Sequence, residues 1–362
     1  YKDTGGGIAD DVVRTEKVCM SLTVPKATMP LNGWPLVIYG HGTGGSFRSH
    51  VRDEVAGALA RATPKFAVVG IDQVEHGPRR GDSTESPNNL FFNFTNPDAA
   101  RGNPMQGAAD QLSLLRFLPT LDLSSAQSGG SAIKIDGTRV VLYGHSQGST
   151  HGSLALPLSA FPGAVLSGNG GNLAQALLNK TSPENIAAGI PIALQDPVTI
   201  DGELTLRMGT DHPALGVLQQ YIDPADPLNF APLLFRRPEP SQPLKHVFQT
   251  FGLSDTYSPP STMAAYIYAA NGMTLAEPPS NFTTEGVERL NMTQATAPVS
   301  GNVTVDTQTV TAVCRQYEPP KEDGKYTSDG HYVVFDVDAA VDDVVAFLEA
   351  LGSGSQPTVP AP

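Results

Sequence analysis

Short apolar runs alternate with stretches of helical periodicity along most of the chain. The runs are typical of strands covered on both faces and lie at residues 35–40, 66–72, 139–143, 163–167 and 246–251. Apolar residues at helical spacing lie between or after them, at about residues 47–62, 98–119, 260–270 and 338–351. This alternation predicts an α/β fold in which a mostly parallel central sheet is flanked by helices.

The alternation is interrupted in two places. Residues 168–243 are rich in Pro, Asp and Leu, and they predict an inserted cap or lid rather than a separate domain. A second, polar insertion covers residues 271–306, and the Pro-, Ser- and Thr-rich residues 352–362 predict a flexible tail. We expect the whole chain, residues 1–362, to form a single domain, which is a common arrangement for α/β chains of this length.

Composition and charge restrict the partners. Charged residues make up 16% of the chain, which excludes disorder driven by charge. The formal net charge of −13 has the wrong sign for nucleic acid, and no apolar stretch approaches the roughly 18 residues of a membrane span. We therefore expect a small-molecule or lipid substrate, no nucleic acid and no stable membrane insertion, and we leave the oligomeric state open. The low Lys content, with many Gly, Thr and Asn residues, favours an exported protein, secreted or periplasmic.

One motif carries a candidate nucleophile. Gly144-His145-Ser146-Gln147-Gly148 fits the pattern G-x-S-x-G, which is weak evidence by itself. It follows an apolar run directly and precedes a stretch compatible with a helix, the setting in which a serine is held on a strained turn. The flanking glycines are then required because side chains there would strike the neighbouring strand or helix. The alternative is an ordinary turn built from small residues.

A serine nucleophile needs a base and an acid that orients the base. At this point the chain resembles serine esterases and lipases of the α/β-hydrolase superfamily, in which Ser, Asp or Glu, and His follow one another along the chain. The resemblance implies Asp255, in the loop after the run 246–251, as the acid and His331, before the last helix, as the base. His76 is the rival candidate for the base, and we interpret it as part of the loop structure because it precedes the serine in the chain. The other carboxylates weighed for the acid role are interpreted as solvated surface groups: Asp223, Asp226, Asp306 and Asp329.

An oxyanion site is also expected. The backbone N–H of Gln147 follows the nucleophile, and His41-Gly42-Thr43-Gly44-Gly45 resembles the H-G-x-G loop of these enzymes, which implies the N–H of Thr43 as the second donor. A phosphate-binding loop is the alternative, but the sequence has no G-K-[ST] ending. We expect no cofactor and no metal.

The resulting hypothesis is a serine carboxylic-ester hydrolase (esterase or lipase) that acts through an acyl-enzyme on apolar short to medium acyl esters. An amidase, an acyltransferase or a perhydrolase would use the same residues, and a catalytically silent binding module could share the fold. Whether the cap moves is left open. The strand order of the superfamily places Cys19 and Cys314, the two cysteines of the chain, far apart in the sheet, which predicts free thiols.

Overall fold

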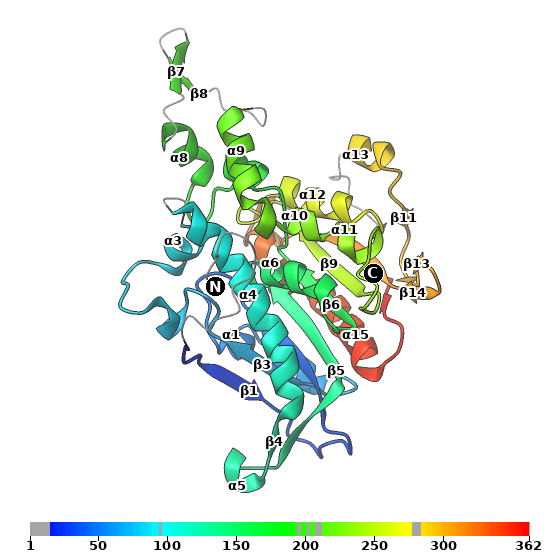
Figure 1. Cartoon of the computed structure of the whole chain (residues 1–362). Coiled ribbons are helices and arrows are strands. Elements are labelled where there is room, and N and C mark those ends of the chain that lie inside the picture. The colour runs from blue at the N-terminus through cyan, green and yellow to red at the C-terminus, as the bar shows by residue number, and fades with distance from the viewer. Residues whose placement is uncertain are drawn as a thin grey trace.

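A computed structural model, shown in Figure 1, gives the structure of the chain. It describes residues 15–93, 96–193, 197–200, 203–206, 212–276 and 284–361.

The core of the molecule is one large, mostly parallel sheet. In spatial order its strands are β1 (Met20–Thr23), β3 (Ala67–Ile71), β2 (Trp34–Gly40), β5 (Ile133–His145), β6 (Gly163–Ser167), β9 (His246–Gly252), β15 (Ala312–Tyr317), β10 (Thr274–Ala276) and β11 (Gln294–Ala295). Strand β1 runs antiparallel to β3, and the other neighbours in this order are parallel. The fold class predicted from the sequence is confirmed.

Alternate residues of each strand enter different hydrophobic clusters, which is why the strands appear as continuous apolar runs. In β2, Leu36 and Ile38 belong to one cluster, and Val37 and Tyr39 belong to the other. The second cluster includes residues of α2 (Val55–Arg61) and α15 (Asp338–Ser353). The opposite face of the sheet is covered by α4 (Pro97–Phe117), α6 (Gln147–Ala155) and α12 (Pro260–Ala270).

The segment predicted as a cap lies between β6 and β9 and extends beyond the end of the sheet (Figure 1). Its described elements are α7 (Leu173–Asn179), α8 (Ile186–Ala193), the hairpin β7 (Pro197–Ile200) and β8 (Glu203–Leu206), α9 (Pro213–Ile222), α10 (Pro227–Phe230) and α11 (Pro232–Phe235). Helices α7 and α9 line a cavity that also reaches Ser146. The segment therefore covers the carboxyl end of β5.

Two later segments differ from the sequence-based expectations. Strands β10 and β11, inside the second insertion, extend the sheet beyond β15. The expected flexible tail is packed: β18 (Thr358–Val359) pairs with β12 (Val299–Ser300), and the side chain of Val359 is fully buried. These strands have two or three residues each, too few to show a periodic pattern.

The shorter elements complete the described chain. They are α1 (Ser49–Arg52), α3 (Pro87–Phe92), β4 (Asp122–Leu123), α5 (Ser125–Ser128), α13 (Thr284–Arg289), β13 (Val303–Val305), β14 (Gln308–Val310), β16 (Lys321–Glu322), β17 (Lys325–Tyr326) and α14 (Val333–Asp336). Of the helices described, none is both long and apolar enough to span a bilayer. Cys19, beside β1, and Cys314, in β15, are free thiols, as predicted.

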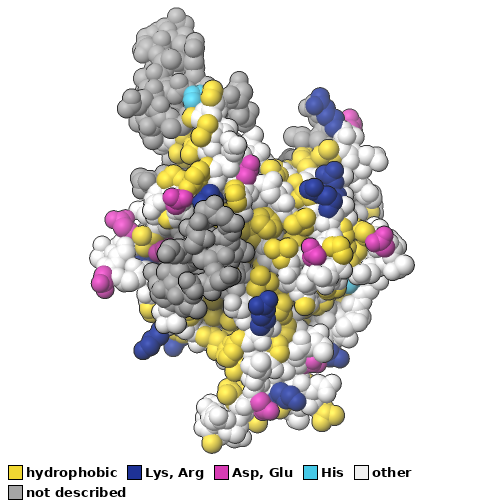
Figure 2. Space-filling view, in the orientation of Figure 1, with side chains coloured by type: hydrophobic (Ala, Val, Ile, Leu, Met, Phe, Trp, Pro, Cys, Tyr) yellow, Lys and Arg dark blue, Asp and Glu magenta, His cyan; other side chains and the backbone are white. Residues whose placement is uncertain are grey.

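The surface carries scattered charges. On the face shown in Figure 2, the coloured Lys and Arg side chains are spread among Asp, Glu and apolar residues and do not gather into one basic patch.

Candidate active site

Ser146 sits on a strained turn between β5 and α6. Its φ of 54° and ψ of −118° lie outside the regions that non-glycine residues usually adopt. The turn is fixed by a hydrogen bond in which the Ser146 N–H donates to the carbonyl oxygen of Ser167, at the end of β6, at 2.8 Å. Strain at one residue persists only where its surroundings enforce it, and such residues cluster at functional sites.

The glycines on either side of Ser146 are sterically required. A Cβ at residue 144 would lie 2.7 Å from the backbone of Gly148, and a Cβ at residue 148 would overlap the carbonyl group of Gly40 in β2. The close approach of β2, β5 and α6 leaves no room for either side chain. The steric reason given for the glycines of the motif is confirmed.

Asp255 and His331 form a buried pair. Asp255 follows β9, and His331 lies in the short 3-10 turn Gly330–Tyr332 before α14. His331 Nδ1 and Asp255 Oδ2 are 2.9 Å apart, and each residue is 3% exposed. The second carboxylate oxygen, Oδ1, accepts the N–H groups of Tyr257 at 2.8 Å and Ser258 at 2.7 Å. This set of donors holds the carboxylate in one orientation and leaves Nε2 as the free nitrogen of the imidazole.

The structure also brings His331 next to the turn that carries Ser146. A Cβ on Gly168 would lie 2.8 Å from His331 Cε1, and the residue before it, Ser167, accepts the Ser146 N–H. The rings of His145 and His331 have centroids 4.7 Å apart. Within the described chain, Ser146 Oγ and His331 Nε2 are not joined by a hydrogen bond, and such bonds often tighten only when substrate is bound.

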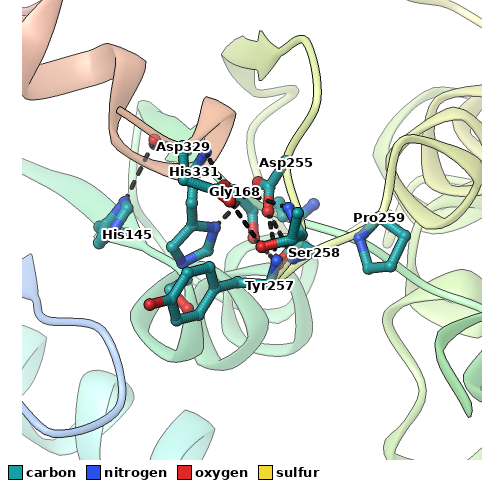
Figure 3. A network of polar contacts seen from close by, with 12 residues as sticks. His145, Gly168, Asp255, Tyr257, Ser258, Pro259, Asp329 and His331 are labelled. Carbon is teal, nitrogen blue, oxygen red and sulfur yellow. Dashed lines mark hydrogen bonds and ion pairs between the residues drawn. The ribbon is translucent and has the colours of Figure 1, made fainter. Parts of the chain in front are cut away.

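Tyr257 covers the other side of the histidine. Its ring is stacked on that of His331 with centroids 4.7 Å apart and an interplanar angle of 14°, an arrangement visible in Figure 3. The same loop is tied to the sheet by Ser258 Oγ, which donates to the carbonyl oxygen of Gly168 at 2.7 Å. No sequence motif points to Tyr257, because its role depends on a ring 74 positions later in the chain.

The loop expected to form an oxyanion site lies against this turn. The Gly148 N–H donates to the carbonyl oxygen of His41 at 3.1 Å, and a Cβ on Gly42 would be 3.2 Å from Ser146 Cβ. Thr43 follows directly. The N–H of Gln147 is the first of α6 and has no acceptor within the helix. Both expected donors are therefore carried by backbone adjacent to Ser146.

His76 supports that loop from behind. It is fully buried, its Nε2 accepts the N–H of Gly44 at 2.8 Å, and its Nδ1 donates to the carbonyl oxygen of Val74 at 2.9 Å. Burial lowers the pKa of His76, which favours the neutral ring that can accept this bond. The interpretation of His76 as loop structure agrees with these contacts.

The rival carboxylates occupy different environments. Asp306 is exposed, as expected. Asp226, expected at the surface, is 2% exposed and accepts the N–H groups of Asn172, Leu173 and Leu228, so the prediction was wrong for this residue. Asp329 is partly buried and accepts the backbone N–H of His331 at 2.8 Å, not a ring nitrogen.

A cavity of about 360 Å³ opens at Ser146 beneath the cap. Its described walls are mostly apolar and include Phe91, Phe92, Leu173, Leu177, Leu218 and Tyr257. Lys180 also lines it, a residue that sequence reasoning did not consider. No cluster of His, Cys, Asp and Glu suited to a metal ion occurs in the described part of the chain.

The order of the strands decides the fold. Ser146 follows β5 near the middle of the sheet, Asp255 follows β9 and His331 follows β15, and the segment expected to form a cap lies between β6 and β9. The chain has the α/β-hydrolase fold. This topology agrees with the superfamily implied by the sequence motifs.

Comparisons with known proteins give weak structural similarities. Neither a family model nor a curated protein matches the sequence. Acetyl xylan esterase 1 from Thermoanaerobacterium sp. JW/SL YS485 has a TM-score of 0.46 and 16% identity, covering 85% of this chain and 75% of that one. A lipase in its open form has a TM-score of 0.41 and 14% identity, covering 93% and 94%. Identities this low do not carry a substrate from those proteins to this chain.

Proposed function

We propose that this α/β-hydrolase is a serine carboxylic-ester hydrolase that works through an acyl-enzyme. The observation that carries the proposal is the buried Asp255–His331 pair beside the strained Ser146, at the wall of an apolar cavity. A serine hydroxyl needs such a base, because it is a weak nucleophile near neutral pH.

In the first half of the reaction, Ser146 Oγ attacks the ester carbonyl carbon while its proton moves to His331 Nε2. The carbonyl oxygen becomes an oxyanion that accepts the N–H groups of Thr43 and Gln147. When this intermediate collapses, the bond to the alcohol oxygen breaks and that oxygen takes the proton from His331. Asp255 stabilises the imidazolium and holds the ring in place throughout.

In the second half, water replaces the alcohol. Its proton moves to His331 Nε2 as its oxygen attacks the acyl carbon, and the proton returns to Ser146 Oγ when the acid leaves. Each half begins and ends with a neutral His331, so no cofactor or redox partner enters the balance.

The cavity suggests the size of the acyl group. Its volume of about 360 Å³ lies at the lower end of the range for small-molecule sites, which is roughly 300–1,000 Å³. Leu173, Leu177 and Leu218 provide an apolar wall for an alkyl chain. We therefore propose short to medium acyl esters as substrates.

Hydrolysis of p-nitrophenyl esters from acetate to dodecanoate tests this function. We expect the highest kcat/KM for butanoate to octanoate, with a fall for longer chains that exceed the cavity. Amide analogues of the same acyl groups measure any amidase activity alongside. If no ester in the series is hydrolysed faster than by buffer, the proposal is wrong and a silent binding module on this fold is the better description.

Part of the cap is firmly attached next to the site. The N–H groups of Thr181 and Ser182 both donate to the carbonyl oxygen of Thr256 at 3.1 Å, beside the loop that carries Asp255. Asp226 joins the start of α7 to α10 through the N–H groups of Leu173 and Leu228. The bonds to Thr256 attach the cap to the loop of Asp255, and those of Asp226 join two helices within the cap. Together they favour a fixed cap over a lid that opens at an oil surface.

We therefore expect no interfacial activation. The rate with tributyrin should follow ordinary saturation as its concentration passes the solubility limit, because the cap has no need to open. A soluble short ester measured in the same buffer is the control. A jump in tributyrin rate at the solubility limit, absent for the soluble ester, would show that the cap moves.

A further inference from the structure

Lys180 places an ammonium group at the wall of the cavity that contains Ser146. It follows α7, is partly buried and lines the cavity together with Phe92 and Tyr257. Its Nζ donates to the carbonyl oxygen of Tyr257 at 2.5 Å and lies 5.3 Å from the ring centroid of Phe92 and 5.5 Å from that of Tyr257. A cation is thus held between two aromatic rings in an otherwise apolar site.

The Lys180 ammonium group has more N–H donors than there are acceptor oxygens around it in the described chain. Of its three N–H groups, one reaches Tyr257, and among the described residues no other oxygen accepts from Nζ and no carboxylate lies within 4 Å. Burial lowers the pKa of Lys180 to about 8, and the charges of Asp255 and Asp329 oppose that shift. Both carboxylates are already engaged, Asp255 by His331 and Asp329 by Thr256.

A second polar residue at this cavity has a side chain without a hydrogen-bond partner in the described chain. Gln147 is 3% exposed and lines the cavity, and its amide oxygen and nitrogen have no hydrogen-bond partner among the described residues. Buried polar groups are normally hydrogen-bonded, since an unmatched one costs roughly 1–3 kcal/mol. The spare N–H groups of Lys180 at the wall of an apolar cavity therefore favour a ligand that is not a plain hydrocarbon.

We propose that Lys180 selects esters whose acyl chain carries a neutral acceptor oxygen, such as a ketone, an ether or a second ester carbonyl, beyond the scissile carbonyl. The negative charges of Asp255 and Asp329 raise the pKa of Lys180 against the effect of burial, so the site already contains negative charge and a neutral oxygen suits it better than a further anion. This inference rests on the proposed esterase function and narrows its substrate class.

Matched pairs of p-nitrophenyl esters test the selection. The pairs are pentanoate with 4-oxopentanoate and hexanoate with 5-oxohexanoate. The enzymatic rate constant of each ester is divided by its rate constant for hydrolysis by hydroxide, which removes the difference in intrinsic reactivity. In the wild-type protein we expect kcat/KM for the better oxo ester to exceed that of its alkyl partner by about tenfold, the equivalent of one hydrogen bond. The p-nitrophenyl ester of hemiadipate, which has a carboxylate at the end of the acyl chain, should have a lower kcat/KM than the oxo ester.

Lys180→Met keeps an unbranched side chain and removes the donors. We expect the preference for the oxo ester to disappear, so that the ratio of kcat/KM between the oxo ester and its alkyl partner falls from about ten to about one. Lys65→Met is the matched control, because Lys65 is an exposed lysine that also donates to a backbone carbonyl, that of Ala60, at 2.9 Å, and does not line the cavity. This control should retain the wild-type preference.

Three results would overturn the inference. The first is an equal loss of kcat/KM for both esters of a pair in Lys180→Met, which would mean that Lys180 only supports Tyr257. The second is a preference for the oxo ester that survives in Lys180→Met. The third is a faster rate for the hemiadipate ester than for the oxo ester in the wild-type protein. Calorimetric binding of N-methyl-5-oxohexanamide and N-methylhexanamide to the same proteins gives the preference without turnover. If no ester is hydrolysed but the oxo amide binds more tightly in a Lys180-dependent way, the proposed function fails and the selection by Lys180 stands.

Discussion

Replacing Ser146 by alanine is expected to lower ester turnover by up to about six orders of magnitude, the loss seen when the serine of a protease triad is removed. The reason is that the acyl-enzyme cannot form without the hydroxyl, while the cavity and the oxyanion donors remain. The melting temperature should hardly change, because no hydrogen bond of Ser146 Oγ supports the fold in the described residues. Steady-state hydrolysis of p-nitrophenyl butanoate and a thermal melt measure the two quantities.

Ser149→Ala provides the matched control for this variant. Ser149 lies one turn further along α6, and its fully buried hydroxyl donates to the carbonyl oxygen of Ser167 at 2.8 Å. The same hydroxyl accepts the N–H of Ser167 at 3.0 Å. Its loss should lower the free energy of unfolding by about 1–3 kcal/mol and leave most of the activity. Turnover near the wild-type level in Ser146→Ala would refute the assignment of the nucleophile.

Asp255→Asn is expected to lower kcat by about four orders of magnitude, the effect of the equivalent change in a serine protease triad. The asparagine amide would offer an N–H where His331 Nδ1 needs an acceptor, so the imidazole would turn its proton toward Ser146 and could not act as a base. The N–H groups of Tyr257 and Ser258 would still find an oxygen. The measurement is kcat for p-nitrophenyl butanoate, with circular dichroism to show that the variant folds.

Asp329→Asn tests whether the acid has been identified correctly. Asp329 contacts the same histidine, but through the backbone N–H of His331 and not through its ring. Its change should reduce kcat by no more than about a hundredfold, through a small displacement of the loop. A larger loss of kcat for Asp329→Asn than for Asp255→Asn would mean that Asp329, and not Asp255, orients the ring of His331.

The central sheet and the turn of Ser146 could be predicted because their signals are local. Val37 and Val68 are fully buried in strands covered on both faces, and such strands appear as continuous apolar runs. The glycines around Ser146 could be predicted as well, because side chains at these positions would strike the neighbouring backbone. The helix expected over residues 47–62 was less regular: it is divided into α1 and α2, with Glu54 between them at a φ of 59°.

Features that depend on distant parts of the chain could not be predicted. Asp226 reads as a surface residue in the sequence, yet one of its partners is the N–H of Asn172, 54 positions earlier. Lys180 has no motif around it, and its contact with Tyr257 spans 77 positions. In both cases the side chain is buried by an element that the local sequence does not reveal.

Intact-mass spectrometry after reaction with a fluorophosphonate ester is the most direct test of Ser146 as an activated nucleophile, because such reagents bond covalently to a serine only when a neighbouring base activates it. We expect one adduct per chain, located by peptide mapping at Ser146, absent from Ser146→Ala and formed much more slowly in Asp255→Asn. An unmodified wild-type protein, or an adduct at another serine in a protein that hydrolyses esters, would contradict it.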